Sequence, residues 1–256
     1  LNDEDQTGGN YNFHLIPMLR SSDLVNWEYM GDAFTTRPDW LAPTSGMWAP
    51  EIDFFDGLYY LYYTVPDTAD SVSGEPGCDA DSAIGVATSE SPLGPWEDKG
   101  IVVEPRRNGL GCNFFWTFDP EVVEDDGQKY IFFGSYYGGI VARELSDDGL
   151  DSDPATQEQI TIPNRYEGPE LVYRDGFWYL FVSATNCCAG PLTGSRCGGM
   201  ALKPSSCRAS ASRSLPQIAS SKNPANFEIV GPSLRDEPYG VMLRKDDAPF
   251  KALVDK

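Results

Sequence analysis

The sequence contains a single histidine, His14, little positive charge and no apolar run of the length that crosses a bilayer. A membrane-spanning helix needs about 20 mostly apolar residues, so we expect no membrane partner. The 19 Lys and Arg against 39 Asp and Glu give a formal net charge of −20, which disfavours nucleic-acid backbones and anionic lipid surfaces as partners. The acidity fits a protein that meets neutral ligands, although it is also a common solubility trait.

The cysteines also lack the paired spacing of a zinc site. The six cysteines are Cys78, Cys112, Cys187, Cys188, Cys197 and Cys207. An even count in glycine-rich loops permits disulfides, and we therefore expect an extracellular or periplasmic protein. The pairing stays open, except that the adjacent Cys187 and Cys188 can hardly bond each other without strain.

Helical periodicity is almost absent before residue 200, and short aromatic and β-branched runs are broken by Gly, Pro, Asn and Asp. The clearest runs are residues 59–64, 130–134 and 178–183. Each follows an Asp-Gly pair, the strongest short hairpin signal. With 41% hydrophobic residues, the 256-residue chain has enough apolar material for one all-β domain.

One pattern occurs three times: a Pro-Glu pair, then an Asp-Gly turn, then a tyrosine, always at the same offsets. The Pro-Glu pairs are Pro50-Glu51, Pro120-Glu121 and Pro169-Glu170; the turns are Asp56-Gly57, Asp126-Gly127 and Asp175-Gly176; the tyrosines are Tyr60, Tyr130 and Tyr179. Repeated units of short strands are typical of a β-propeller. We therefore predict radially arranged sheets of short strands.

A second phrase recurs at residues 21–27 and 88–96, and both copies end in a tryptophan, Trp27 and Trp96. We interpret it as the outer hairpin of each repeat, with both indole rings packed between sheets. The sequence before the first phrase, at residues 21–27, shows no inner strand that would belong to the same repeat. The predicted propeller is therefore incomplete, with its first inner strand and last blade missing or altered.

Two carboxylates precede the repeated prolines, Asp119 in one copy and Glu167 in the next. Inner strands of neighbouring blades begin near the central axis, so both side chains are expected to face one funnel. Glycoside hydrolysis needs such a pair, and a nearby carboxylate helps the acid to keep its proton. In the competing interpretation, Asp119 caps a turn and Glu167 is a solvated loop acid. The glutamates that recur in every copy, Glu51, Glu121 and Glu170, are interpreted as structural.

Several segments, in order, resemble glycoside hydrolase family 43 over about residues 10–200. They are Met47-Trp48-Ala49-Pro50-Glu51-Ile52, residues 82–89, Phe118-Asp119-Pro120, residues 133–140 and Tyr166-Glu167-Gly168-Pro169. The likeness is strongest to its arabinanase and arabinofuranosidase members. It implies a five-bladed β-propeller that cleaves arabinan or xylan side chains with inversion.

The resemblance also implies roles. Asp119 matches the family's pKa-modulating Asp and Glu167 its general acid. The general base belongs to an earlier Asp-Pro motif that has no match here; Asp3 and Asp5 lack the following proline and strand. We therefore expect an inverting glycosidase with little or no activity in this chain alone. Arginine precedes the middle Asp in related fructan-cleaving propellers, and Phe118 argues against them.

The candidate sugar-binding side chains are Trp48, Trp116, Phe118 and Tyr166, which flank the carboxylates, although each ring can equally serve as packing. No cofactor is expected. Family members often hold a structural calcium ion through a histidine of the last blade, but His14 lies in the wrong segment for that role. We therefore assign no metal ligand.

The organisation predicted along the chain has three parts. Residues 1–200 form the propeller domain, and the Ser- and Ala-rich residues 201–221 form a linker or junction. Residues 222–256, with strands at 227–230 and 239–243, resemble the C-terminal part of a periplasmic amino-acid-binding protein. We expect a fusion or a divergent last blade there, without transport function.

The predicted function is hydrolysis of α-L-arabinofuranosyl linkages in arabinan, a plant cell-wall polysaccharide, by a monomer. One alternative is a β-xylosidase of the same family, active on xylan. Another is a carbohydrate-binding propeller without catalysis. A solute-binding fusion is a third, which amino-acid binding would support.

Overall fold

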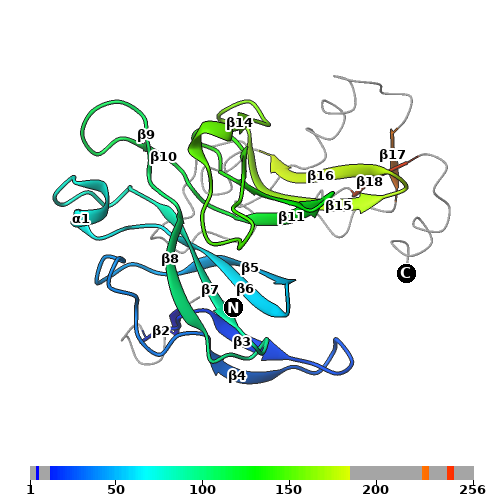
Figure 1. The fold of residues 1–256 in the computed structure, drawn as a ribbon, viewed down its shortest axis with the longest axis horizontal. Coiled ribbons are helices and arrows are strands. Elements are labelled where there is room, and N and C mark those ends of the chain that lie inside the picture. Colours follow the sequence, from blue (N-terminus) through cyan, green and yellow to red (C-terminus); the bar gives the residue numbers. More distant parts are fainter. Residues whose placement is uncertain (1–3, 6–11, 185–226, 231–240, 245–256) are drawn as a thin grey trace, which may run out of the picture.

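The computed structural model describes residues 4–5, 12–184, 227–230 and 241–244, and Figure 1 shows them as an all-β fold. Two short helices interrupt the strands, α1 (Asp70–Ser73) and the 3₁₀ helix η2 (Pro154–Thr156). Neither helix in this described part has the length or the apolar character needed to cross a bilayer.

The strands follow one another in short pieces. In chain order they are β1 (Glu4–Asp5), β2 (Asn12–Phe13), β3 (Pro17–Arg20), β4 (Glu28–Asp32), β5 (Trp48–Phe55), β6 (Leu58–Val65), β7 (Ala83–Ser89), β8 (Glu97–Val103), β9 (Arg106–Arg107), β10 (Phe114–Phe115), β11 (Glu121–Asp125), β12 (Gln128–Phe133), β13 (Val141–Glu144), β14 (Glu158–Gln159), β15 (Tyr166–Arg174), β16 (Phe177–Ala184), β17 (Phe227–Val230) and β18 (Val241–Arg244).

Two four-stranded antiparallel sheets, β5-β6-β7-β8 and β11-β12-β13-β14, form the centre of the described fold. The remaining strands pair as hairpins or short ribbons: β3–β4, β15–β16, β1–β2, β9–β10 and β17–β18. Strand β11 contacts both β5 and β15, so the first strands of three successive sheets lie side by side. The repeat predicted from the sequence therefore corresponds to successive sheets.

The Asp-Gly pairs form the hairpin turns that the sequence predicts. Asp56, Asp126 and Asp175 have φ of 52°, 50° and 52°, and the glycine after each also has positive φ. Two consecutive residues with positive φ define a type I′ turn, whose twist matches that of the flanking strands. These turns join β5 to β6, β11 to β12 and β15 to β16.

The residue before each repeated proline adopts the left-handed backbone region. These residues are Ala49 (φ 43°), Asp119 (φ 55°) and Gly168 (φ 55°). The ladders β5–β6 and β15–β16 each shift register at this point. Asp119 is therefore the equivalent of Ala49 and Gly168, whereas Glu167 is the equivalent of Trp48 and Phe118. The same backbone turn thus occurs at the start of each of the three inner strands. In each copy it presents two side-chain positions, the residue before the proline and the residue before that one.

Strand β6 is buried on both faces, which explains its continuous apolar run. Tyr60 and Tyr62 pack into a cluster with side chains of the β11–β14 sheet. Leu61, Tyr63 and Val65 alternate with them and pack against Leu15, Ile16 and neighbours from the segment around β3 and β4. Because side chains alternate along a strand, one sheet is packed between two others. This arrangement is the one expected of neighbouring blades.

The structure corrects two details of the sequence interpretation. Trp27, expected between sheets, has 54% of its surface exposed, whereas Trp96 packs partly buried against the second core cluster. Strands β17 and β18, predicted as isolated segments, pair with each other. The proposed linker at 201–221 and the rest of the tail lie outside the described residues.

Gly85 on β7 is required by close packing rather than by its backbone angle. A methyl group there would lie 2.6 Å from ring atoms of both Trp40 and Tyr63. We expect Gly85→Ala to lower the free energy of unfolding by about 1–3 kcal/mol, the usual cost of an overpacked core. Urea denaturation of both proteins measures the difference. An unchanged midpoint would show that these rings move aside without cost.

Candidate functional site

Asp119 lies between strands of two neighbouring sheets, β6 and β15, and is hydrogen-bonded to both. Its N–H donates to Thr64 Oγ1 on β6 at 3.0 Å. Its carboxylate accepts a hydrogen bond from the backbone N–H of Gly168, the residue after Glu167. The structure therefore places the Asp119 carboxylate against the backbone next to Glu167, a residue 48 positions away in the sequence.

Burial raises the pKa of Asp119 to about 6, and the hydrogen bond from Gly168 opposes that rise. Desolvation disfavours the charged carboxylate, while an N–H donor favours it. Asp119 is therefore a mixture of neutral and ionised forms in the mildly acidic range. A group poised in this way is typical of functional sites.

Glu167 is buried, with 8% of its surface exposed, and does not behave as the solvated loop acid of the competing interpretation. It lies near the start of β15 and pairs with Ser183 of β16, directly before the register shift at Gly168. Burying a carboxyl group is costly unless it is hydrogen-bonded or paired. Both candidate acids thus occupy one protected region.

A row of aromatic rings leads away from the carboxylate pair. The ring centroids of Trp48 and Phe118 are 6.0 Å apart, and those of Phe118 and Trp116 are 5.7 Å apart in a stacked arrangement. Tyr137 continues the row at 6.3 Å from Trp116, a residue that sequence analysis did not single out. Trp48 has 46% of its surface exposed, in addition to its contact with Phe118.

Tyr166, the fourth ring predicted for sugar binding, is buried. It packs with Ile140 and Val182 in a small apolar cluster, and the guanidinium of Arg165 lies 5.9 Å from its ring centroid. Only 7% of the residue is exposed. The structure thus gives Tyr166 a packing environment, in contrast to Trp48.

A second group of acids links the three repeats. Glu51 on β5 faces Glu121 on β11 and Glu170 on β15, with Asp53 nearby. Burial, aided by those neighbouring charges, raises the pKa of Glu51 to about 8; burial likewise raises the pKa of Glu121 to about 7 and of Asp53 to about 6. Glu121 Oε1 also accepts the N–H of Leu171 at 2.9 Å.

These glutamates were interpreted as structural because they recur in every copy. Their position is consistent with that interpretation, since they join the first strands of three sheets. The recurrence in the sequence does not reveal that burial raises the pKa of Glu51 and of Glu121.

His14 is paired elsewhere in the structure. Its Nδ1 lies 3.0 Å from Asp32 Oδ1, and its ring packs edge-on against Tyr29. Among the residues that the structure describes, no three His, Cys, Asp or Glu side chains are grouped to hold a metal ion. We derive no chemical step through a metal.

Comparison with known proteins gives relatives that carry the names of glycosidases. The chain is 33% identical over 185 residues to the extracellular endo-α-(1→5)-L-arabinanase 1 of Bacillus subtilis, covering 68% of this chain and 53% of that protein. It is 34% identical over 202 residues to the extracellular exo-α-(1→5)-L-arabinofuranosidase of Cellvibrio japonicus, covering 68% and 54%. The chain thus spans about half the length of these curated relatives.

The fold agrees with the sequence relationship. The structure of the Cellvibrio cellulosa α-L-arabinanase complexed with arabinohexaose matches with a TM-score of 0.51 and 32% identity, covering 67% of this chain and 59% of that one. The sequence model of Glycosyl hydrolases family 43 matches residues 6–226. Because that match extends over most of the sequence, the chain belongs to glycosyl hydrolase family 43.

Proposed function

We propose that the protein hydrolyses α-L-arabinofuranosyl linkages of arabinan by an inverting mechanism, with Glu167 as general acid and Asp119 as its electrostatic partner. The observation that carries the proposal is the contact between the Asp119 carboxylate and the Gly168 N–H, beside the buried Glu167. It supports the view that two carboxyl groups act on one glycosidic bond.

In this reaction, Glu167 donates its proton to the leaving oxygen while the bond from that oxygen to the anomeric carbon breaks. A water molecule attacks the opposite face and loses its proton to a second carboxylate, the general base. The new C–O bond has inverted configuration. No Asp of this sequence matches the family's base motif, so this step needs a carboxylate that we cannot assign here.

Arabinan is the substrate class that the relatives favour. Two curated relatives carry names of arabinan-cleaving enzymes, and one related structure contains arabinohexaose. The exposed ring of Trp48, with Phe118 and Trp116 behind it, supports stacking on sugar C–H faces. Tyr166 is buried and is not part of this proposed surface.

The proposed architecture is an incomplete five-bladed propeller over residues 1–200, followed by a junction and a tail. The pair of four-stranded sheets and the adjacent hairpins support it. The disulfide Cys78–Cys112 supports an extracellular or periplasmic location, where such bonds persist. We propose a monomer that acts on plant polysaccharide and binds neither nucleic acid nor membranes.

This chain alone is expected to release little or no arabinose from arabinan, because no base is matched that would activate water. Reducing-sugar release from arabinan and from xylan, followed by product analysis, measures this and identifies the preferred polymer. Robust turnover of arabinan by the 256-residue protein would contradict the proposal that this chain lacks a general base. A preference for xylan would favour the β-xylosidase alternative.

A carbohydrate-binding propeller without catalysis is the second candidate, favoured by the row of aromatic rings combined with the unmatched base. Titration calorimetry with arabino-oligosaccharides distinguishes the two. Binding without products, even after the chain is extended by a family Asp-Pro strand, would favour the binding module over the enzyme.

A further inference from the structure

Asp119 is carried by a segment whose backbone is fixed residue by residue. Trp116 N–H donates to Tyr137 O at 3.0 Å, and Phe118 O accepts from Gly134 N–H at 2.8 Å. These bonds attach the segment to the loop between β12 and β13. On its other side, the segment is attached through side-chain hydrogen bonds to the loop that follows β6.

Thr117 is the centre of that second attachment. It is fully buried, and its N–H donates to Ser82 Oγ at 2.9 Å. Its Oγ1 accepts from Arg106 Nε at 3.2 Å, while Arg106 Nη2 donates to Trp116 O at 2.8 Å. The Arg106 guanidinium therefore donates hydrogen bonds to two successive residues, Thr117 and Trp116, which lie two and three positions before Asp119.

Arg106 is an unusual residue to find in this place. Only 7% of it is exposed, and its guanidinium lies 5.7 Å from the ring centroid of Phe115 and 5.1 Å from that of Phe133. Burial lowers its pKa to about 10, which leaves it cationic at neutral pH. Among the described residues, no carboxylate lies within 4.0 Å of it.

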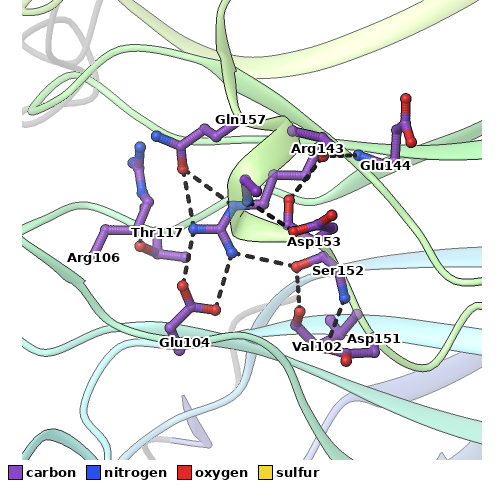
Figure 2. Close-up of polar contacts among 12 residues, drawn as sticks. Val102, Glu104, Arg106, Thr117, Arg143, Glu144, Asp151, Ser152, Asp153 and Gln157 are labelled. Carbon is purple, nitrogen blue, oxygen red and sulfur yellow. Dashed lines mark hydrogen bonds and ion pairs between the residues drawn. The ribbon is translucent and has the colours of Figure 1, made fainter.

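The neighbouring buried arginine differs. Arg143 lies next to Arg106 and Thr117 (Figure 2) and forms a bidentate pair with Glu104 at 3.0 Å. Arg143 is thus paired directly with an opposite charge, whereas Arg106 has neutral hydrogen-bond acceptors, Thr117 Oγ1 and Trp116 O, and interacts with the charge of Glu104 only at longer range. Burying a charge without a directly paired counter-ion is costly for stability. A role in fixing the geometry of the adjacent segment accounts for its presence.

We propose that Arg106 is a positioning residue: through Thr117 and Trp116 it holds Phe118 and Asp119 in place beside Gly168 and Glu167. Its catalytic consequence rests on the proposed function, but its structural consequence does not. We call the two hydrogen bonds from Arg106 to Thr117 Oγ1 and Trp116 O the Arg106 clamp. When the clamp is removed, the segment 116–119 is expected to become more mobile and Asp119 more solvated. The carboxyl group should then titrate closer to its ordinary value of 3.8 than to about 6.

The test is a pH titration of the Asp119 carboxyl carbon by ¹³C NMR in the 256-residue protein, with Asp119→Asn used to assign the signal. Arg106→Gln removes the positive charge and the pair of guanidinium hydrogen bonds to Thr117 and Trp116. Thr117→Val keeps the shape of the side chain but removes its hydroxyl, which accepts from Arg106 Nε and donates to Phe115 O at 3.3 Å. Both variants are expected to lower the midpoint by one pH unit or more while retaining a cooperative thermal transition.

Arg107→Gln is the matched control, since Arg107 is exposed and pairs with Glu75 at 2.6 Å on the other side of the same strand pair. It should leave the Asp119 midpoint unchanged, and Arg106→Lys should restore it only in part. If Arg106→Gln does not fold, Thr117→Val decides the outcome. An unchanged Asp119 midpoint in folded Thr117→Val would overturn the proposal.

The titration requires no hydrolase activity, so its result is separate from the proposed function. Where an extended, active form is prepared, Arg106→Gln should reduce kcat by tenfold or more with a smaller change in KM, because positioning acts on the reacting groups. Absence of hydrolysis in every form would reject the proposed enzyme function but would not affect the proposal that Arg106 positions Asp119. Equal kcat in both extended forms would reject the catalytic consequence of the clamp.

Discussion

Glu167→Gln is expected to reduce turnover of arabinan by about 10²–10⁴, the usual contribution of a general acid. The measurement uses a chain extended at its amino end by the Asp-Pro strand of a family member, so that a base is present. Glutamine keeps the size and position of the side chain at the start of β15 but has no proton to donate. The loss should be largest for natural linkages, whose leaving group is poor.

An aryl arabinofuranoside with a good leaving group provides an internal comparison, since it needs little protonation. Glu167→Gln should be nearly as active as the parent on this substrate. Glu124→Gln, the same exchange at an exposed position of β11, should leave both rates unchanged. Equal arabinan turnover in Glu167→Gln and its parent would reject the assignment of Glu167 as the acid.

Stability is expected to fall as the pH rises from about 4.5 to about 8, in contrast to proteins whose carboxylates are stabilised by folding. Glu51 has a pKa near 8 in the folded chain against an ordinary value of 4.5, and Glu121 has a pKa near 7. Below about 4.5 both states keep these protons. Above it the unfolded chain releases them first, so ionisation favours unfolding until the folded pKa is passed.

At about 1.36 kcal/mol per pKa unit, the Glu51 shift alone corresponds to roughly 5 kcal/mol. Because Glu51 is only partly buried and the groups are coupled, solvent screening reduces the expected loss of stability across this window to a few kcal/mol. Thermal unfolding monitored between pH 5 and pH 8 measures it. Glu51→Gln removes the group with the largest shift and should make the melting temperature less dependent on pH, with a gain at pH 8. A parent protein that becomes more stable toward pH 8 would show that these acids are ionised in the folded chain.

Local patterns in the sequence were sufficient for the hairpins and their order. The Asp-Gly pairs predicted type I′ turns because few other residues accept two positive φ angles in succession. The offset repeat predicted equivalent strands, and β5, β11 and β15 do lie together. The proximity of residues 119 and 167 followed from that equivalence.

Properties set by tertiary packing were not accessible in the same way. Trp27 and Trp96 occupy similar phrases, yet one is exposed and one is packed, because a neighbouring sheet covers only the second. Tyr166 and Trp48 flank the site in sequence but differ in exposure for the same reason. The Cys78–Cys112 disulfide joins loops from different sheets, and spacing alone could not select it.

The clamp on Asp119 was missed for a related reason. Arg106 is eleven residues before its partner Thr117, and nothing in its local sequence distinguishes it from the exposed Arg107. Only the position of β9 beside the segment at 116–118 makes one arginine buried and the other free to reach Glu75. Burial, rather than residue type, separates the two roles.

The most direct test of a shared site at Asp119 and Glu167 is an NMR titration of the chain with arabinohexaose, following the backbone amides of Asp119 and Gly168. Asp119 lies just before β11 and Gly168 lies on β15 of another sheet, and the two residues are linked through the Asp119 carboxylate. If both residues contact one sugar, both amide signals shift along the same binding curve. Saturable binding that leaves either amide unperturbed would contradict the account.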